Sequence, residues 1–525
     1  MLKKIRLYLV TARYLKIKQI IYLIVYNLKF YTYHNSKSIE LQKINYKLNT
    51  LFILNDRQYL KISNGQKIYN RFNLETKFKK YLDWNFIGNG RLWNYHLRYF
   101  EFLNQKNLST TEKITVISNF NNFLTKNEIK LEPYPTSKRL INVISFLISL
   151  KQNSFQNNLI QPLFKQYCFL KKNIEYNILG NHLFENLCSL YISSLFFSDF
   201  DYNKKIGRRI LIELDEQICD DGSHFELSPM YHKLILFRLF QLYKISQSEK
   251  FKNKIISYIQ IMVNWLNTIA YNDGSVPHFN DSTNEISMNS LDLFSIANNF
   301  NIIPQKIKLG SSGYRKYTNK FFEFIIDVNG ISPEYQPGHS HSDHLSFEMR
   351  FNNIPYIVDP GISTYEICER RTWERSTIAH NTISINNSNQ SRIWKSFRVA
   401  DRAKVTINKD LRSRVNASCV YNVNGYKVTH EREVVFKNKK IKINDQVTSL
   451  KTNNIARYYL HPDVKPEKIC SNKIKLNNEL IIEFENSLNV LLLNYLFNRG
   501  FNDKVSSKFI KVELNDKLST SINII

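Results

Sequence analysis

The histidines of this chain are concentrated in one stretch, residues 338–381, which opens with the sequence Gly-His-Ser-His-Ser-Asp-His. Four of the twelve histidines of the chain lie there, with Asp359 between them: His339, His341, His344 and His380. Imidazole nitrogens and carboxylate oxygens bind Zn²⁺, and imidazoles also transfer protons near neutral pH. The stretch therefore predicts a site for metal binding, for acid–base chemistry, or for both.

Two other polar motifs stand where helices are expected to begin. Gly180–Asn186 contains Asn181, His182 and Glu185, and an N-cap asparagine followed by a carboxylate in the first turns also has a purely structural explanation. Ser228–His232 has serine as the cap and proline at the first helical position, and the helix dipole would favour a phenolate at Tyr231. Each motif alone is more typical of packing, but helix ends in a domain of stacked hairpins gather on one rim.

The elements that must position these motifs change period near residue 310. Before it, apolar residues recur at helical spacing in Leu140–Leu150, Leu183–Phe197, Ile206–Ile218, Leu234–Tyr243 and Ile255–Ile269. After it, alternation with period two predicts strands at Phe322–Val328, Leu345–Phe351, Ile354–Asp359, Arg402–Ile407, Ala417–Val423, Tyr426–Phe436, Ile441–Val447, Leu480–Phe484 and Val490–Asn494. This pattern predicts an all-α domain followed by an antiparallel sandwich.

Hairpin turns are expected at Asn352-Asn353 and at Lys437–Lys440. Regular pairing across the first turn would place Asp359 opposite Ser346, near the start of the strand that the histidine cluster enters. That register supports a site built from two imidazoles and one carboxylate.

The composition suits a chain with large packed cores, because 43% of its 525 residues are hydrophobic. Its net charge of +28 favours an anionic partner, although a lysine-rich coding bias explains the charge equally well. Half of the net charge lies in residues 1–80, which contain 17 Lys and Arg and 3 Asp and Glu, a net charge of +14. No finger, zipper or RNA-binding motif accompanies the charge, so nucleic acid is not the expected partner.

The N-terminal segment is basic and contains the apolar run Ile20–Tyr26. Seven residues are too few to span a bilayer, which needs ~20, and no small-residue cleavage site follows the run. We expect a basic amphipathic segment that lies on a membrane surface or on the protein's own body. The six cysteines are scattered and form no Cys-x-x-Cys pair, so they suggest neither a disulfide framework nor a thiolate zinc site.

Taken together, the polar stretches, Asp273–Pro277 and the aromatic run around Trp93 resemble the heparinase II/III-like polysaccharide lyases. The motifs follow in the family's order over residues 83–400, and residues 1–80 resemble members encoded among bacterial surface-polysaccharide genes. The resemblance implies an incomplete α/α toroid over residues 81–308 and an antiparallel β-sandwich over residues 309–525. A basic, partly helical segment, residues 1–80, would precede them.

The reaction that the resemblance implies is β-elimination at a uronic acid, in which the C5 proton leaves and the C4 glycosidic bond breaks. The carboxylate charge must be offset as an enolate-like state forms, and a base and an acid must reach C5 and the leaving oxygen. By resemblance, Asn181 and His182 meet the carboxylate. Tyr231, with a pKa lowered by a basic pocket, is the acid and an alternative base, and His339 is the other proton-transfer residue.

The resemblance also implies a metal site, usually zinc, formed by His341, Asp359 and His380. Water or another residue would complete a tetrahedral set. The family implies a structural role for the metal, which would fix the loop that carries His339, whereas a catalytic role would be activation of water. Asp343 and His344 are interpreted as residues that support the ligands or lie on the surface.

Other positions are assigned to substrate binding on weaker grounds. Glu185 matches a carboxylate found in some members' pockets, and Tyr365 is the nearby candidate for a tyrosine that some alginate-active members use after the Val-Asp-Pro-Gly motif. Arg238 and Arg375 are candidates for gripping anionic groups of the glycan. The expected partner is an acidic polysaccharide or oligosaccharide, and nothing in the sequence indicates an oligomeric state.

Two other functions fit the same residues. One is a metal-dependent glycan hydrolase or isomerase that uses His341, Asp359 and His380 catalytically, and the other is a non-catalytic protein of surface-polysaccharide binding or assembly. The compartment is equally open. The family is mostly exported, which implies the cell envelope or periplasm, whereas the absence of a clear cleavable signal favours the cytoplasm.

Overall fold

The computed structural model describes residues 2–28, 44–52, 57–63, 65–126, 128–150, 157–448 and 453–525. These residues form two compact units. The helical unit comprises residues 15–218 and 234–260, and the β unit comprises residues 1–14, 219–233 and 261–525. The sequence places residues 219–233 and 261–308 in the helical domain, whereas this division groups them with the strands.

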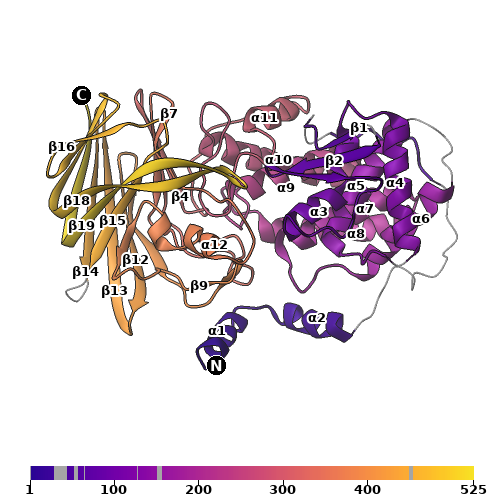
Figure 1. Ribbon diagram of the computed structural model, residues 1–525, viewed down its shortest axis with the longest axis horizontal. Helices are drawn as coiled ribbons and strands as arrows, with labels where there is room; N and C mark the ends of the chain where they lie inside the picture. Colours follow the sequence, from indigo (N-terminus) through magenta and orange to yellow (C-terminus); the bar gives the residue numbers. More distant parts are fainter. Residues whose placement is uncertain are drawn as a thin grey trace. The chain divides into compact units, whose positions relative to one another are not determined.

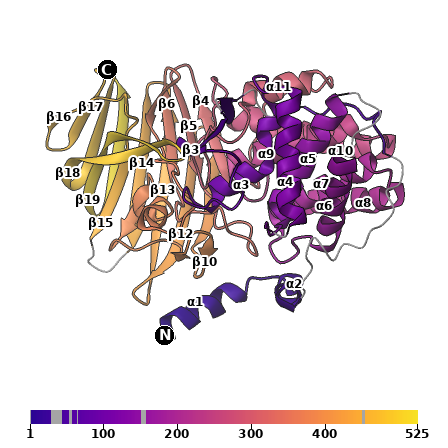
Figure 2. The same ribbon diagram turned by 45° about the vertical axis from the view of Figure 1, so that its right-hand side comes forward.

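The helical unit is built mainly from helices, most of which pack against one another. They are α2 (Ile17–Leu28), α3 (Arg91–Tyr99), α4 (Thr110–Thr125), α5 (Pro133–Ser149), α6 (Asn157–Lys172), α7 (Gly180–Phe196), α8 (Phe200–Gln217), most of α9 (Pro229–Ile245) and the first part of α10 (Glu249–Ile269). A capping box between Ser109 and Glu112 begins α4. The α7 helix packs against both α5 and α8 (Figure 2). Nearly all of its side chains are buried.

A small antiparallel sheet in the helical unit was not expected from the sequence. Its strands are β1 (Leu60–Ser63), β2 (Gln66–Arg71) and β3 (Leu74–Phe78). The turn between β2 and β3 is made by Phe72 and Asn73, which both have positive φ. The expectation of a basic, partly helical segment over residues 1–80 did not include these strands, because short strands rich in Lys, Asn and Gln lack a clear alternation of apolar residues.

The β unit contains two large antiparallel sheets that share one hydrophobic core. The first has the order β4-β5-β6-β7, with strands at Tyr314–Thr318, Phe322–Asp327, Phe347–Phe351 and Ile354–Ile357. The second has the order β11-β12-β13-β14-β19-β18-β17-β16, and β15 joins it by pairing with β19 and β8. These ten strands are Ile383–Ile385 (β8), Lys404–Leu411, Arg414–Val423, Tyr426–Lys437, Lys440–Thr448, Asn454–Tyr459, Pro466–Cys470, Lys473–Leu476, Leu480–Gly500 and Asp503–Ile524 (β11–β19).

Alternation places one face of each strand in this core. In β12, every second side chain from Val415 to Val423 is buried, and these side chains join Phe324 and Phe347 of the other sheet in one cluster. The helices of this unit are short: α1 (Leu2–Ala12), α11 (Ser290–Asn298) and α12 (Glu369–Glu374). A pair of two-residue strands, β9 (Ile393–Trp394) and β10 (Arg398–Val399), and the 3₁₀ turn Thr377–Ala379 also belong to this unit, and a second 3₁₀ turn, Glu101–Asn104, lies in the helical unit.

The most extended element of the β unit is the hairpin formed by β18 and β19 (Figure 1). The sequence predicts two strands where β18 runs unbroken from Leu480 to Gly500, and it does not predict β19. Register shifts between Glu485 and Asn489 interrupt the regular pairing, which is why the apolar pattern breaks there although the strand continues.

The predicted hairpin turns are confirmed. Asn352 and Asn353 both have positive φ and connect β6 to β7, while β13 and β14 pair from Lys437 and Lys440. The predicted register across the first turn is wrong, because Met349 pairs with Ile357 and a bulge follows. Asp359 therefore lies beyond the paired part of β7, where its side chain is free to turn toward the histidine stretch.

Candidate functional site

The β unit brings Tyr231 and His339 together. Their rings stack with centroids 3.9 Å apart and an interplanar angle of 26°. Tyr231 lies in the first turn of α9, where the Ser228 hydroxyl accepts a hydrogen bond from its backbone N–H, so the predicted cap is confirmed. His339 is buried, on the loop before β6. The fold therefore places these two proton-transfer candidates side by side, although more than 100 residues separate them in sequence.

The direction of the Tyr231 pKa differs from the expectation. Burial, the neighbouring Tyr365 hydroxyl and the carboxylates of Asp281 and Glu226 raise the pKa of Tyr231 well above its ordinary value of 10.0. The predicted lowering by a basic pocket was wrong, because burial of the phenol has the largest effect on its pKa and the groups nearby raise it further. A neutral phenol suits a proton donor better than a proton acceptor.

Asp281 connects the histidines of the stretch. Its carboxylate, which is fully buried, lies 2.9 Å from Nδ1 of His339 and 2.9 Å from Nε2 of His341. Arg371 donates two further hydrogen bonds to the same carboxylate, at 2.5 and 2.7 Å. Burial alone would raise the pKa of Asp281, but Arg371 and the two imidazoles hold it well below its usual range.

Sequence reasoning missed Asp281 and Arg371. Asp281 follows Asn280 in a loop without a recognisable motif, and Arg371 lies on the short helix α12. Arg371 holds the Asp281 carboxylate in place, and this carboxylate orients the imidazoles of His339 and His341. Each imidazole contacts Asp281 through one of its two ring nitrogens. Arg371 also lies over the ring of Tyr365, 4.9 Å from its centroid, and the Tyr365 hydroxyl is 3.4 Å from that of Tyr231.

Three buried atoms near this pair lack a hydrogen-bond partner among the described residues. They are Nδ1 of His341, Oδ2 of Asp343 and Nε2 of His380. Ligand atoms of these three residues lie within 4.8 Å of one another. Two imidazole nitrogens and one carboxylate oxygen are a donor set that Zn²⁺ accepts, so the residues fit a metal ion. Burial lowers the pKa of His341 to about 3, which keeps its ring in the neutral form that binds metals.

Asp359, which was predicted as the third ligand, contacts His380, another of the predicted ligands. Its Oδ2 lies 2.6 Å from Nδ1 of His380, and its Oδ1 accepts a hydrogen bond from the Gly361 N–H. In this geometry Asp359 orients His380 as Asp281 orients His341, and Asp343 provides the carboxylate of the cluster. Asp343 and His344 are both buried, so the part of their interpretation that placed them on the surface was wrong.

The helical unit holds its own polar cluster at the start of α7. Asn181 is buried, and it is not the N-cap that the sequence suggested, because α7 begins at Gly180 and Leu179 occupies the cap position. Nδ1 of His182 lies 3.2 Å from a carboxylate oxygen of Glu175, and its ring packs 4.4 Å from that of Tyr134. His182 therefore has an acidic partner that could share a proton with it.

The arginine and glutamate candidates for substrate binding are paired with each other or with the backbone. Arg238 and Glu185 form a buried two-point ion pair at 2.5 and 3.1 Å, and Lys138 lies 3.8 Å from the same carboxylate. Burial would raise the pKa of Glu185, but these two cations lower it. In the β unit, the fully buried Arg375 donates to the Ser340 carbonyl, between the two site histidines, and so holds their loop.

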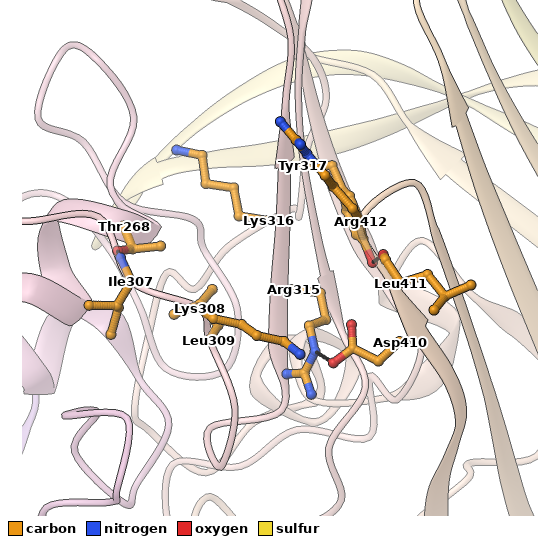
Figure 3. A pocket seen from close by; sticks show the side chains of 10 residues that line it. All are labelled: Thr268, Ile307, Lys308, Leu309, Arg315, Lys316, Tyr317, Asp410, Leu411 and Arg412. Carbon is orange, nitrogen blue, oxygen red and sulfur yellow. Dashed lines mark hydrogen bonds and ion pairs between the residues drawn. The ribbon is translucent and has the colours of Figure 1, made fainter.

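A separate cavity of about 360 Å³ lies in the β unit, and its lining includes Lys308, Arg315, Lys316, Asp410 and Arg412 (Figure 3). The Arg315 guanidinium binds the Asp410 carboxylate at 2.8 Å. None of the predicted site residues lines this cavity. The candidate site is therefore defined by the side-chain cluster around Asp281 and not by this hollow.

The chain thus consists of an α-helical unit and a unit of antiparallel sheets, and the latter carries a stacked tyrosine–histidine pair. Comparison with known families identifies it further. The family description "Heparinase II/III N-terminus" matches residues 135–308, and "Heparinase II/III-like, C-terminal" matches residues 304–503. The chain belongs to the heparinase II/III-like family, as its motifs predicted.

Curated relatives and solved structures agree with this assignment. Heparin-sulfate lyases are 26% identical over 245 residues in Bacteroides stercoris (41% of this chain, 37% of that protein) and 25% identical over 324 residues in Pedobacter heparinus (55% and 47%). The chain thus matches less than half the length of each. A crystal structure of heparinase III has a TM-score of 0.70 at 16% identity and covers 94% of this chain and 88% of that chain. The likeness confirms an α-helical domain joined to a β domain.

Proposed function

We propose that the protein is a polysaccharide lyase that cleaves a uronic-acid-containing glycan by β-elimination. The observation that carries the proposal is the stacked pair of Tyr231 and His339, two proton-transfer groups within reach of one sugar residue. The names of the curated relatives, heparin-sulfate lyases, support a sulfated or carboxylated glycosaminoglycan as the substrate class.

The raised pKa of Tyr231 supports one division of the two roles. His339 accepts the C5 proton, the electrons of that C–H bond form the C4–C5 double bond, and the C4–O bond breaks. The neutral phenol of Tyr231 protonates the leaving oxygen. Asn181 and His182 keep their predicted role of offsetting the substrate carboxylate, since amide and imidazole N–H groups are suitable donors.

We also propose a structural Zn²⁺ held by His341, Asp343 and His380, with Asp281 and Asp359 as the carboxylates that orient the two imidazoles. When bound, the ion would supply a fixed positive charge that holds the loop between His339 and Asp343. For the architecture of the two units, the packing of the helices supports an incomplete α/α toroid. The core that the two sheets share supports a β-sandwich.

The function is tested by assaying the purified protein with heparan sulfate, chondroitin sulfate, alginate and the producing organism's own surface glycan. We expect chain cleavage to be accompanied by the ultraviolet absorbance of a C4–C5 unsaturated uronate with at least one of them. Depolymerisation without that absorbance would favour the hydrolase alternative, and binding without cleavage would favour the non-catalytic one.

The zinc proposal predicts a loss of stability when the metal is removed. A metal that binds only the folded state stabilises it by about 4 kcal/mol at a free concentration of roughly 1,000 times Kd, so the apo protein should unfold at a lower temperature. Elemental analysis should find one zinc per chain in the wild type and much less in Asp343→Asn.

The matched control is Asp463→Asn, which changes an exposed carboxylate of the same unit and should retain the metal. Wild-type protein that contains no zinc, and whose thermal unfolding does not respond to added zinc, would contradict the proposal. Activity that disappears on chelation while the unfolding temperature stays constant would favour the metal-dependent hydrolase or isomerase.

A further inference from the structure

The α2 helix of the helical unit turns its most apolar face to solvent. Five large aliphatic side chains on this face are between 41% and 76% exposed: Ile17, Ile20, Ile21, Ile24 and Leu28. Their spacing of three, one, three and four residues places them on one side of a helix with 3.6 residues per turn. We call these five residues the α2 apolar face. No polar side chain interrupts it.

The opposite side of α2 is fixed to its own unit. Gln19 is buried and donates to the Ile178 carbonyl, and the rings of Tyr22 and Tyr176 lie 4.7 Å apart. Lys16 forms an ion pair with Glu216, and Lys18 lies over the Tyr176 ring. The polar and aromatic side chains thus anchor the helix, and this anchoring is what directs the aliphatic side chains outward.

Such an arrangement is the reverse of an ordinary surface helix, which buries its aliphatic stripe. Contiguous exposed aliphatic side chains on an anchored helix mark an interaction surface. The choice between a lipid and a protein partner is decided by charge: residues 1–39 contain eight Lys and Arg and no Asp or Glu. A uniformly cationic segment is complementary to anionic lipid headgroups.

The α1 helix of the β unit shows the same two properties on a smaller scale. Ile5 and Leu9, one turn apart, are 45% and 67% exposed, and Lys4 and Arg6 beside them are exposed as well. Tyr8 and Thr11 attach the helix to its unit through Trp394. Both described helices that precede residue 29 therefore combine an attached face with an exposed aliphatic face.

We propose that the α2 apolar face is a docking surface for an anionic lipid bilayer. The twelve residues of α2 extend for about 18 Å, too short for a hydrocarbon core of ~30 Å, so the helix would lie in the plane of the interface. None of the helices that the structure describes is long and apolar enough to cross a membrane. The aliphatic side chains would enter the boundary between headgroups and acyl chains, and cationic side chains would remain at the headgroups.

The proposal is tested by sedimentation of the full chain with vesicles of phosphatidylcholine alone or mixed with phosphatidylglycerol at roughly 3:1. We expect binding to the anionic vesicles that weakens in high salt. The double variant Ile20→Glu/Ile24→Glu should bind at least about tenfold more weakly, because two aliphatic insertions are replaced by anions. Brominated lipids should quench the tryptophan fluorescence of an Ile24→Trp variant more strongly than that of the wild type.

The matched control is Phe200→Glu/Ile212→Glu, which introduces the same charges at two exposed apolar positions of α8 and should bind like the wild type. Circular dichroism identifies any variant that fails to fold. If a double variant does not fold, the fluorescence quenching of Ile24→Trp decides whether the α2 apolar face enters the bilayer. Equal binding of both double variants, or no additional quenching, would overturn the proposal. The proposal would also be overturned if the wild type did not bind vesicles but formed dimers, and if Ile20→Glu/Ile24→Glu abolished these dimers. The α2 apolar face would then bind a second copy of the chain.

Discussion

Replacement of Tyr231 by phenylalanine should reduce turnover by about three orders of magnitude while leaving the fold intact. Proton transfer by a positioned side chain contributes roughly 10²- to 10⁴-fold, and the variant removes the only proton of that ring that can be transferred. The lost interaction is made in the transition state, so kcat should fall far more than KM changes. Among the described residues, the Tyr231 hydroxyl makes a long contact, 3.4 Å, with Tyr365, so stability should fall by less than about 1 kcal/mol.

The measurement is the initial rate of ultraviolet absorbance increase on the glycan that the wild type cleaves, together with urea unfolding of both proteins. Tyr426→Phe is the matched control, since Tyr426 is an exposed tyrosine of β13, and its rate should equal that of the wild type. A Tyr231→Phe variant that retains most of its activity would exclude this tyrosine as the acid and would favour a role in binding.

The second large effect is expected for Asp281→Asn, in both stability and activity. The variant leaves Arg371 buried without its counter-ion, and removal of one partner from a buried pair costs about 3–5 kcal/mol. His339 would also lose the carboxylate that orients its ring, and misplacement of a reacting group by ~1 Å can cost about 100-fold in rate. As a positioning residue, Asp281 should affect kcat more than KM.

The control is Asp503→Asn, which breaks the exposed ion pair with Arg499 and should change the free energy of unfolding by less than about 1 kcal/mol. Urea unfolding and initial rates of the two variants separate the effects. Asp281→Asn with wild-type stability would contradict the buried-pair argument, and full activity in a destabilised Asp281→Asn would show that His339 does not need this carboxylate.

The main elements were predictable because their periodicity is strong. The apolar repeats that predicted α5, α7 and α8 extend over three turns or more, and alternation predicted β12 and β13 closely. The strand β19 was missed because lysines, asparagines and an aspartate interrupt its alternation, and its pairing on both sides stabilises it regardless. Tertiary pairing there outweighs local propensity.

The site was predictable in its histidines and tyrosine but not in the groups that hold them. His339, His341 and His380 lie in dense motifs, whereas Asp281 and Arg371 become neighbours only through the fold. The bulge after Met349 changed the register predicted for Asp359, and no periodicity reveals such a bulge. The direction of the Tyr231 pKa was mispredicted for the same reason, because its burial, which has the largest effect, is produced by the fold.

The carboxylate of Asp281 couples the position of His339 to that of His341, because it contacts both imidazoles. One oxygen faces His339, a proposed proton-transfer residue, and the other faces His341, a proposed zinc ligand. Any ion that draws His341 by a few tenths of an ångström also moves the hydrogen-bond partner of His339. Exchange of zinc for a larger cation would therefore alter turnover even though the ion never touches the sugar, and the identity of a structural metal would become a rate-setting variable.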